Sequence, residues 1–234
     1  MDLATATWTD AAGADPDCVL LPVGSTEQHG PHAPLGTDAL TAEAIAEAGA
    51  QAHEDEVVVA PTVPVGVSEE HRAFAGTLWV SPDTLRSTVR EVAGSLAHHG
   101  WERLVVVNGH GGNAPALREA TAAVTREGEV YAVPFTWFEA VDDEMGHAGP
   151  LETALLRRHH PDLVREDRVE DATAGGSGRW GEWVAGVNLA YDTAEFTENG
   201  VVGDPARGDA ELGRDLTERA GGALAEVIAA VVER

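Results

Sequence analysis

Short apolar runs alternate with longer amphipathic segments along the first 135 residues of the chain. The short runs are rich in Val and Leu and are bounded by polar or glycine-containing stretches, which predicts buried strands. These strands are expected at residues 18–23, 56–60, 103–107 and 129–134. Helical spacing of apolar side chains predicts helices at residues 38–54, 82–99 and 114–126. Strands that alternate with helices predict an α/β fold, with three layers, α/β/α, around a mainly parallel central sheet.

The second part of the chain is less regular. A helix is expected from Gly149 to the residues before Pro161, and a last amphipathic helix is expected after Pro205. Residues 162–203 show little periodicity, and we expect them to pass over the functional site or to lie at a subunit interface. The length of the chain is compatible with one α/β domain, so residues 1–234 are expected to form a single domain.

A cluster of polar side chains follows the first predicted strand. The stretch at residues 21–38, LPVGSTEQHGPHAPLGTD, carries Glu27, His29, His32 and Asp38 among glycines and prolines. An extended backbone would direct Glu27 and His29 to the same side, and the fixed φ angles of the prolines limit rearrangement of the loop. This stretch predicts the first half of a metal site. The alternative is a solvated turn with polar surface residues.

A second informative stretch, NGHGGN at Asn108–Asn113, follows the third predicted strand and opens a helix. Its position is that of a phosphate-binding glycine loop, but it lacks the GxGxxG spacing and the P-loop lysine. His110 is better placed as a ligand, because the missing side chains of its glycine neighbours let a metal or substrate approach the backbone. The motif alone is equally compatible with a structural histidine in a tight turn.

Fold topology predicts that these two stretches meet. The first and third strands of such a sheet end at the same edge, so their polar residues are expected to converge there: Glu27, His29, Asp38 and His110. Carboxylates and imidazoles without sulfur suit Zn, Mn or Fe as divalent ions. The two oxygens of an aspartate can bridge two ions about 3.5–4 Å apart, and a water bound to such an ion becomes a nucleophile near neutral pH.

Three candidate residues follow the fourth predicted strand. His147 is placed to pass a proton to a leaving group. Glu152 is a candidate metal ligand or a base that orients His147. Trp137, in the loop at residues 136–146, is a candidate for the wall of the substrate pocket, although packing explains a loop aromatic at least as well.

Four motifs, in this order and at these separations, resemble the creatininase family of metal-dependent amidohydrolases: GSTEQHGPHAPLGTD, SEEHRAFAGT, VVVNGHGGN and GHAGPLET. The resemblance covers residues 21–155. It implies an α/β/α fold, a binuclear centre with two divalent ions per chain, and hydrolysis of a non-peptide C–N bond. It also implies a homo-oligomer, commonly a hexamer made from dimers.

The resemblance also implies roles for individual residues. The family pattern places the metal ligands at Glu27, His29, Asp38 and His110. Asp38 would bridge the two ions and His147 would act in catalysis, whereas His32 has no place among the ligands. The stretch SEEHRAFAGT resembles the substrate-side loop of the family, which implies that Glu70 and His71 contact the substrate.

Two positions depart from creatininase itself. That enzyme has a glutamate ligand two residues after the motif histidine, where this chain has Gly112. Glycine has no side chain with which to coordinate, so one ion needs another ligand, and Glu152 is the candidate substitute. Pro150 stands where relatives often have an acidic residue, which changes the polar contacts expected beside His147.

Composition narrows the choice of partners. The chain has 40 acidic residues against 15 Lys and Arg, and its net charge is −25. This charge repels nucleic acid and anionic lipid, so the expected partner is a small-molecule substrate, with no nucleic acid and no membrane. Cys18 alone can form no intrachain disulfide. No leader-like segment and no run of ~18 apolar residues is visible, so a cytoplasmic location is expected.

These observations together predict an enzyme, a metal-dependent amidohydrolase. A metal-bound hydroxide would attack an amide, cyclic amide or formamide carbonyl, and His147 would protonate the leaving nitrogen. Narrower alternatives are creatinine amidohydrolase itself and a formamidopyrimidine-nucleotide deformylase, for which Arg72 is the nearby phosphate contact. Alternatives of other kinds are a non-catalytic metal- or ligand-binding protein, suggested by Gly112, and a peptidase that trims a modified peptide.

The spread of acidic residues from Asp2 to Glu233 leads to a testable hypothesis about salt. Because screening weakens repulsion between surface carboxylates, we expect a halophilic protein that is more stable in concentrated salt. Thermal unfolding followed at increasing KCl concentration should give a rising melting temperature. Equal melting temperatures in dilute buffer and in molar KCl would reject the hypothesis.

Overall fold

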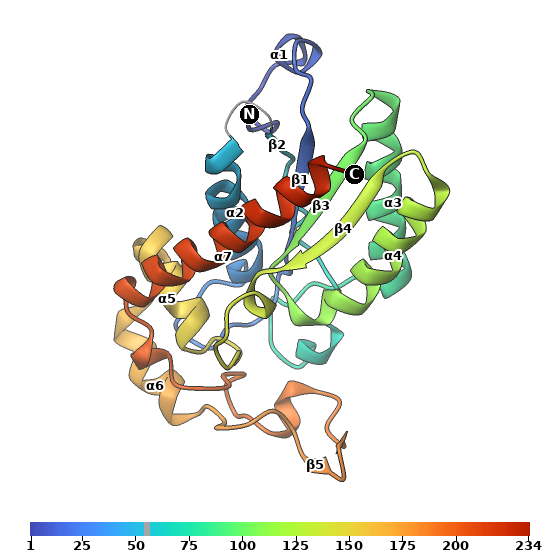
Figure 1. Cartoon of the computed structure of the whole chain (residues 1–234). Coiled ribbons are helices and arrows are strands. Elements are labelled where there is room, and N and C mark those ends of the chain that lie inside the picture. Colours follow the sequence, from blue (N-terminus) through green and yellow to red (C-terminus); the bar gives the residue numbers. More distant parts are fainter. Residues whose placement is uncertain (54–56) are drawn as a thin grey trace.

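Four parallel strands form the central sheet of the computed structural model, which describes residues 1–53 and 57–234 (Figure 1). Their order across the sheet is β2-β1-β3-β4. The strands are β1 (Cys18–Val23), β2 (Val57–Val59), β3 (Arg103–Asn108) and β4 (Tyr131–Thr136). Leu20 in β1 pairs with Val59 on one side and with Val105 on the other. The strand that follows β1 in sequence, β2, therefore lies on one side of it, and β3 lies on the other side.

Both faces of the sheet are covered, which explains why its strands are continuous apolar runs. Leu20 and Val105 pack in one core, and Val19 and Leu104 pack in the core on the opposite face. All six residues of β1 are buried. The alternation of side chains between the faces assigns successive residues to different cores.

Helices form a layer on each face, as predicted (Figure 1). One layer contains α3 (Pro82–His98) and α4 (Ala114–Glu127). The other contains α2 (Thr37–Ala50), α5 (Pro150–His159) and α7 (Ala210–Val232). The predicted three-layer α/β/α fold with a mainly parallel sheet is confirmed.

Several predicted boundaries are matched by local chemistry. Ser81 caps α3 by accepting a hydrogen bond from the backbone nitrogen of Thr84 at 3.2 Å, with Pro82 at the first helical position. Gly128 ends α4 in the left-handed conformation, at φ 88°. Strand β4 begins two residues later than predicted, because its register starts with Tyr131 opposite Arg103. The final helix begins at Ala210, after a short turn at Pro205–Arg207.

Two predicted segments extend beyond what the structure describes. The end of the helix predicted at residues 38–54 and the start of the strand predicted at 56–60 fall on residues 54–56, which lie outside the described ranges. Helix α2 itself ends at Ala50 and continues as a short 3-10 turn at Gln51–His53.

The irregular segment at residues 162–203 contains one short α-helix and two short strands that the sequence pattern did not predict: α6 (Val169–Ala174), β5 (Trp183–Val184) and β6 (Val187–Asn188). The strand β5 lies beyond the carboxyl ends of the central strands, at the bottom of Figure 1. Near the N-terminus, α1 (Trp8–Ala12) was also not predicted. Among the described helices, none has the length and apolar character that crossing a membrane requires.

The start of α2 docks closely against the ends of β1 and β3. A Cβ atom at Gly24 would lie 2.2 Å from the backbone nitrogen of Ala39, and one at Gly109 would lie 2.2 Å from the carbonyl oxygen of Asp38. Only glycine permits this approach. Asp38 is thereby placed where the strand order reverses, which is the usual position of sites in open α/β sheets.

Candidate metal centre

Six acidic and histidine side chains meet at the carboxyl edge of the sheet. They come from the loop after β1, the first turn of α2, the loop after β3, the segment before α5, and the first turn of α5. Each is at most 6% exposed: Glu27, His29, Asp38, His110, His147 and Glu152. The predicted convergence of the stretches after the first and third strands is therefore present in the structure.

The carboxylate of Asp38 lies between two histidines. Its Oδ1 is 3.1 Å from Nε2 of His29, and its Oδ2 is 3.4 Å from Nδ1 of His110. Oε1 of Glu27 is 3.1 Å from Nδ1 of His110, and Oε1 of Glu152 is 3.4 Å from Nε2 of His29. Glu27, Asp38 and His110 thus form one group of possible metal ligands, and His29, His147 and Glu152 form another. Asp38 links the two groups through its contact with His29.

Backbone carbonyls fix the ring orientation of three histidines. Nδ1 of His29 lies 3.2 Å from the carbonyl of Glu27, Nε2 of His110 lies 2.7 Å from that of Val67, and Nε2 of His147 lies 2.7 Å from that of Gln28. A carbonyl oxygen only accepts, so each of these nitrogens donates a proton. In the neutral rings, the other nitrogen then directs a lone pair toward the carboxylates, an arrangement typical of metal-binding histidines.

Several buried polar atoms of the cluster have no hydrogen-bond partner among the described residues. They are both carboxylate oxygens of Glu27, Nε2 of His29 and Oδ2 of Asp38. An unsatisfied buried polar group costs about 1–3 kcal/mol, and more when it is charged. Divalent cations between these atoms would satisfy all of them, so the residues fit a metal centre.

The shifted pKa values of Asp38, His29 and His110 indicate that positive charge must balance the carboxylates of the cluster. Burial and the neighbouring Glu27 raise the pKa of Asp38 to about 7. Burial opposes protonation of His29 and His110, but the nearby carboxylates outweigh it and raise the pKa of both rings well above the ordinary value. Without a metal, protons would occupy the space between these groups, and metal binding would displace them.

His71 lies beside the cluster, next to Glu27 and His147. Its Nε2 is 3.5 Å from Oε1 of Glu27, and its ring stacks on that of His147 with centroids 4.4 Å apart. Burial and the adjacent His147 lower the pKa of His71 to about 2. His71 is therefore neutral at physiological pH.

A cavity of about 350 Å³ opens onto the cluster. Its apolar walls are Phe138, Met145 and Trp180, and its polar walls include Glu70, His71 and His147. No described residue of this lining is Lys or Arg. Sequence reasoning gave no role to Phe138 or Trp180, because only packing shows which loop aromatics face the cavity.

Glu70 lies against the space that Gly112 leaves. A Cβ atom at Gly112 would be 2.8 Å from Oε1 of Glu70 and 2.3 Å from the carbonyl oxygen of Val67. Oε1 of Glu70 is also 3.5 Å from Nε2 of His110. The carboxylate beside Gly112 thus comes from Glu70, whereas Glu152, the expected substitute, faces His29 and accepts a hydrogen bond from the backbone nitrogen of Ala148.

Two further residues near the cluster, Trp137 and His32, lie outside both the cavity lining and the ligand groups. Trp137 does not line the cavity: its side chain is completely buried and packs in the core, while the next residue, Phe138, faces the cavity. His32 lies outside the ligand groups, as expected, and its Nε2 is 3.0 Å from the hydroxyl of Thr153.

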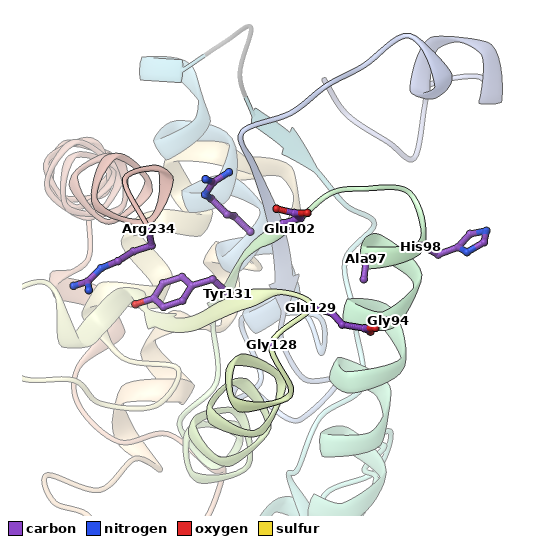
Figure 2. A pocket seen from close by; sticks show the side chains of 9 residues that line it. Gly94, Ala97, His98, Glu102, Gly128, Glu129, Tyr131 and Arg234 are labelled. Atoms are coloured by element: carbon purple, nitrogen blue, oxygen red, sulfur yellow. The ribbon is translucent and has the colours of Figure 1, made fainter.

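A larger hollow, of about 620 Å³, lies at the opposite edge of the sheet, near the start of β3 and β4 (Figure 2). Its labelled side chains include Glu102, Tyr131 and Arg234, and all are at least partly exposed. Among the described residues that line it, no group of buried carboxylates and histidines occurs. The carboxyl edge, where buried carboxylates meet histidines, is therefore the candidate site.

Comparison with known proteins agrees with this geometry. The family model described as "Creatininase: Creatinine amidohydrolase" matches residues 4–228. A mycofactocin precursor peptide peptidase from Mycolicibacterium smegmatis is 39% identical over 204 residues, which cover 85% of this chain and 78% of that protein. A creatinine amidohydrolase from Pseudomonas putida is 33% identical over 196 residues, which cover 70% of this chain and 74% of that protein.

The fold also matches a solved structure named "Creatininase Mn", with a TM-score of 0.81 and 26% sequence identity. The match covers 97% of this chain and 96% of the other. The sequence motifs, the cluster at the carboxyl edge of the sheet and these comparisons lead to one conclusion: the chain belongs to the creatininase family and is a metal-dependent hydrolase.

Proposed function

We propose that the chain hydrolyses a non-peptide amide C–N bond with two divalent ions bound at the Asp38 carboxylate. One ion would be held by Glu27, Asp38 and His110, and the other by His29, Asp38 and Glu152. The observation that carries the proposal is the position of Asp38, whose two oxygens face different histidine nitrogens. The ligands are oxygen and nitrogen atoms only, which favours Zn, Mn or Fe.

The ions, when bound, would supply an activated water and stabilise negative charge on the carbonyl oxygen. His147 is placed to accept a proton from that water. Its Nε2 donates to the carbonyl of Gln28, so Nδ1 is free to accept. Burial and the neighbouring His29 lower the pKa of His147 to about 4, which keeps the ring neutral before transfer. The protonated ring could then donate to the leaving nitrogen.

The cavity favours a small substrate without a phosphate group. Its walls combine apolar side chains with the carboxylate of Glu70, and its described lining contains no lysine or arginine. Arg72, the phosphate contact considered from sequence, does not line the cavity and instead pairs with Asp192 at 2.9 Å and Glu69 at 3.4 Å. These contacts favour an uncharged or cationic amide over a nucleotide.

Cleavage of a short peptide is a second candidate function, supported by two observations. Relatives named as mycofactocin precursor peptide peptidases are 35–39% identical to this chain. A second cavity of about 920 Å³ adjoins the first and shares Met145, Gly146 and Trp180 with its lining. Together the two cavities offer room for a longer substrate.

We also propose that the chain forms a homo-oligomer and is located in the cytoplasm. The hairpin formed by β5 and β6 exposes Trp183, Val184 and Val187 by more than half, and Tyr191 beyond it is 87% exposed. An isolated two-stranded hairpin is marginally stable in water. A contact with another subunit would cover these side chains.

Metal binding can be tested with Asp38→Asn. Because this change removes the shared charge, bound metal should fall from two ions per chain to one or fewer. Adding MnCl₂ to chelator-treated wild type should raise the melting temperature by about 5–10 °C, and the variant should lose most of this rise. Asp83→Asn, the same change on an exposed helix, should retain both properties. Unchanged metal content in Asp38→Asn would contradict the bridging role.

The reaction can be tested with a substrate panel on metal-loaded protein. The panel should contain creatinine, simple amides, formamides and end-blocked peptides, with products identified by mass spectrometry. We expect turnover of a non-peptide amide and a loss of at least about 100-fold in Glu27→Ala. Turnover of peptides alone would favour the second candidate function. Tight binding without any turnover would indicate a non-catalytic binding protein.

The same panel tests the role of Glu70 in substrate contact. Glu70→Gln should raise KM for the active substrate by about tenfold, because a charge-assisted contact on the cavity wall is lost. Glu69→Gln is the matched control, since Glu69 occupies the same short turn but faces Arg72. Equal effects of the two changes would remove Glu70 from the substrate contact.

Oligomerisation can be tested by light scattering after size-exclusion chromatography. Wild type should have a mass of at least two chains of 24.5 kDa each. A Trp183→Ser, Val187→Ser variant should dissociate, whereas Trp8→Ser, at another exposed tryptophan, should not. A monomeric wild type would refute the proposed assembly.

A further inference from the structure

The side chain of Gln28 joins His71, one of the two stacked histidines of the cavity, to the backbone of a distant segment. Its Oε1 is 2.9 Å from the backbone nitrogen of Gly30, which can only donate. Its Nε2 is 3.1 Å from the carbonyl oxygen of Gly200, which can only accept. Two backbone groups with single roles therefore fix which end of the amide is oxygen and which is nitrogen.

This orientation determines where His71 carries its proton. Nε2 of Gln28 has a second hydrogen, which it donates to Nδ1 of His71 at 2.8 Å. The hydroxyl of Thr193 lies 3.3 Å from the same nitrogen. Nδ1 is thus an acceptor, so the neutral ring carries its proton on Nε2, the nitrogen directed toward Glu27 and the cavity.

The backbone of Gln28 fixes the same Nε2–H tautomer in His147, but there the unprotonated Nδ1 is the nitrogen that faces Glu27, at 3.7 Å from its Oε1. The carbonyl oxygen of Gln28 accepts the Nε2 proton of His147 at 2.7 Å, which leaves Nδ1 without a proton. The two rings are stacked with an interplanar angle of 29°. One residue therefore gives two neighbouring rings complementary roles, a proton donor on His71 and a proton acceptor on His147.

We propose that Gln28 is a positioning residue that holds His71 as a hydrogen-bond donor to the substrate carbonyl oxygen and His147 as the acceptor of the proton from the attacking water. This inference rests on the proposed amide hydrolysis and deepens it. It separates His71 from the metal ligands, because Nε2 cannot coordinate an ion while it carries a proton. A neutral imidazole N–H is an effective donor to a developing oxyanion.

The fold reserves space for this arrangement. Gly200 has φ 85°, and a Cβ atom there would lie 1.9 Å from Oε1 of Gln28. Two residues later, Val202 exchanges backbone hydrogen bonds with His147 at 2.9 and 2.8 Å. The irregular segment that contains Thr193, Gly200 and Val202 therefore positions both the amide of Gln28 and the backbone of His147.

The decisive test is the protonation pattern of the histidine rings, measured by ¹⁵N NMR on the zinc-loaded protein. Wild type should show the Nε2–H form of His71, with Nε2 not bound to metal. Gln28→Glu has the same shape but cannot donate to Nδ1, so the proton of His71 should move to Nδ1 or both nitrogens should be protonated. Gln51→Glu makes the same change at an exposed position and should leave the spectrum unchanged.

Kinetics on the active substrate of the panel give a second measurement. Gln28→Glu should lower kcat by at least about tenfold with little change in KM, and it should keep the wild-type metal content. Gly200→Ala, which displaces the amide without altering Gln28, should produce the same change in the His71 spectrum. These two variants separate the hydrogen bond from a general effect on folding.

Three outcomes would overturn the inference: metal bound to Nε2 of His71 in wild type, an unchanged His71 spectrum in Gln28→Glu, or an unchanged kcat despite a changed spectrum. Failure of the proposed function is distinguishable, because it would appear as absence of turnover in wild type. The tautomers of the two rings can be read from the spectrum in either case.

Discussion

The close contact between the start of α2 and the ends of β1 and β3 is the constraint on which the site depends. Gly24 and Gly109 lack side chains at the two points where the backbone of α2 passes. This contact sets the Asp38 carboxylate between the loop that carries Glu27 and His29 and the loop that carries His110. A larger residue at either glycine would move the helix away and separate the two halves of the cluster.

The electrostatics of the cluster follow from this packing. Glu27, Asp38 and Glu152 are brought together with almost no access to water, where like charges repel strongly. Among the described residues, no lysine or arginine forms an ion pair with these three carboxylates, and their ion-pair partners are histidines. The compensating charge must therefore come from protons or metal ions, which couples occupancy of the site to stability of the fold.

Sequence patterns predicted the parts of the structure that follow from local rules. The apolar runs located the parallel strands, and the common edge of those strands predicted that His110 would join Glu27, His29 and Asp38. The roles of Glu70 and Gln28 depend instead on contacts between distant segments. Glu70 reaches the side of Gly112 only because the loop at residues 66–71 packs there, and the amide of Gln28 is oriented by Gly200, 172 residues away.

Aromatic residues show the same limit. Trp137 and Phe138 are adjacent in a short 3-10 turn, and the direction of that turn sends one into the core and the other to the cavity. Neither periodicity nor composition distinguishes two neighbouring aromatics in an irregular loop. The burial of Trp137 corrects its expected position, and no local signal in the sequence would have identified Phe138 instead.

The contact at Gly112 has a consequence for how such sites can diverge. The carbonyl of Val67 and the carboxylate of Glu70 occupy the volume into which any side chain at residue 112 would grow. Restoring a glutamate there would therefore require a different path for the loop at residues 66–71. The two segments can change only together, so in related chains the residue at this position and the conformation of that loop should covary as one evolutionary unit.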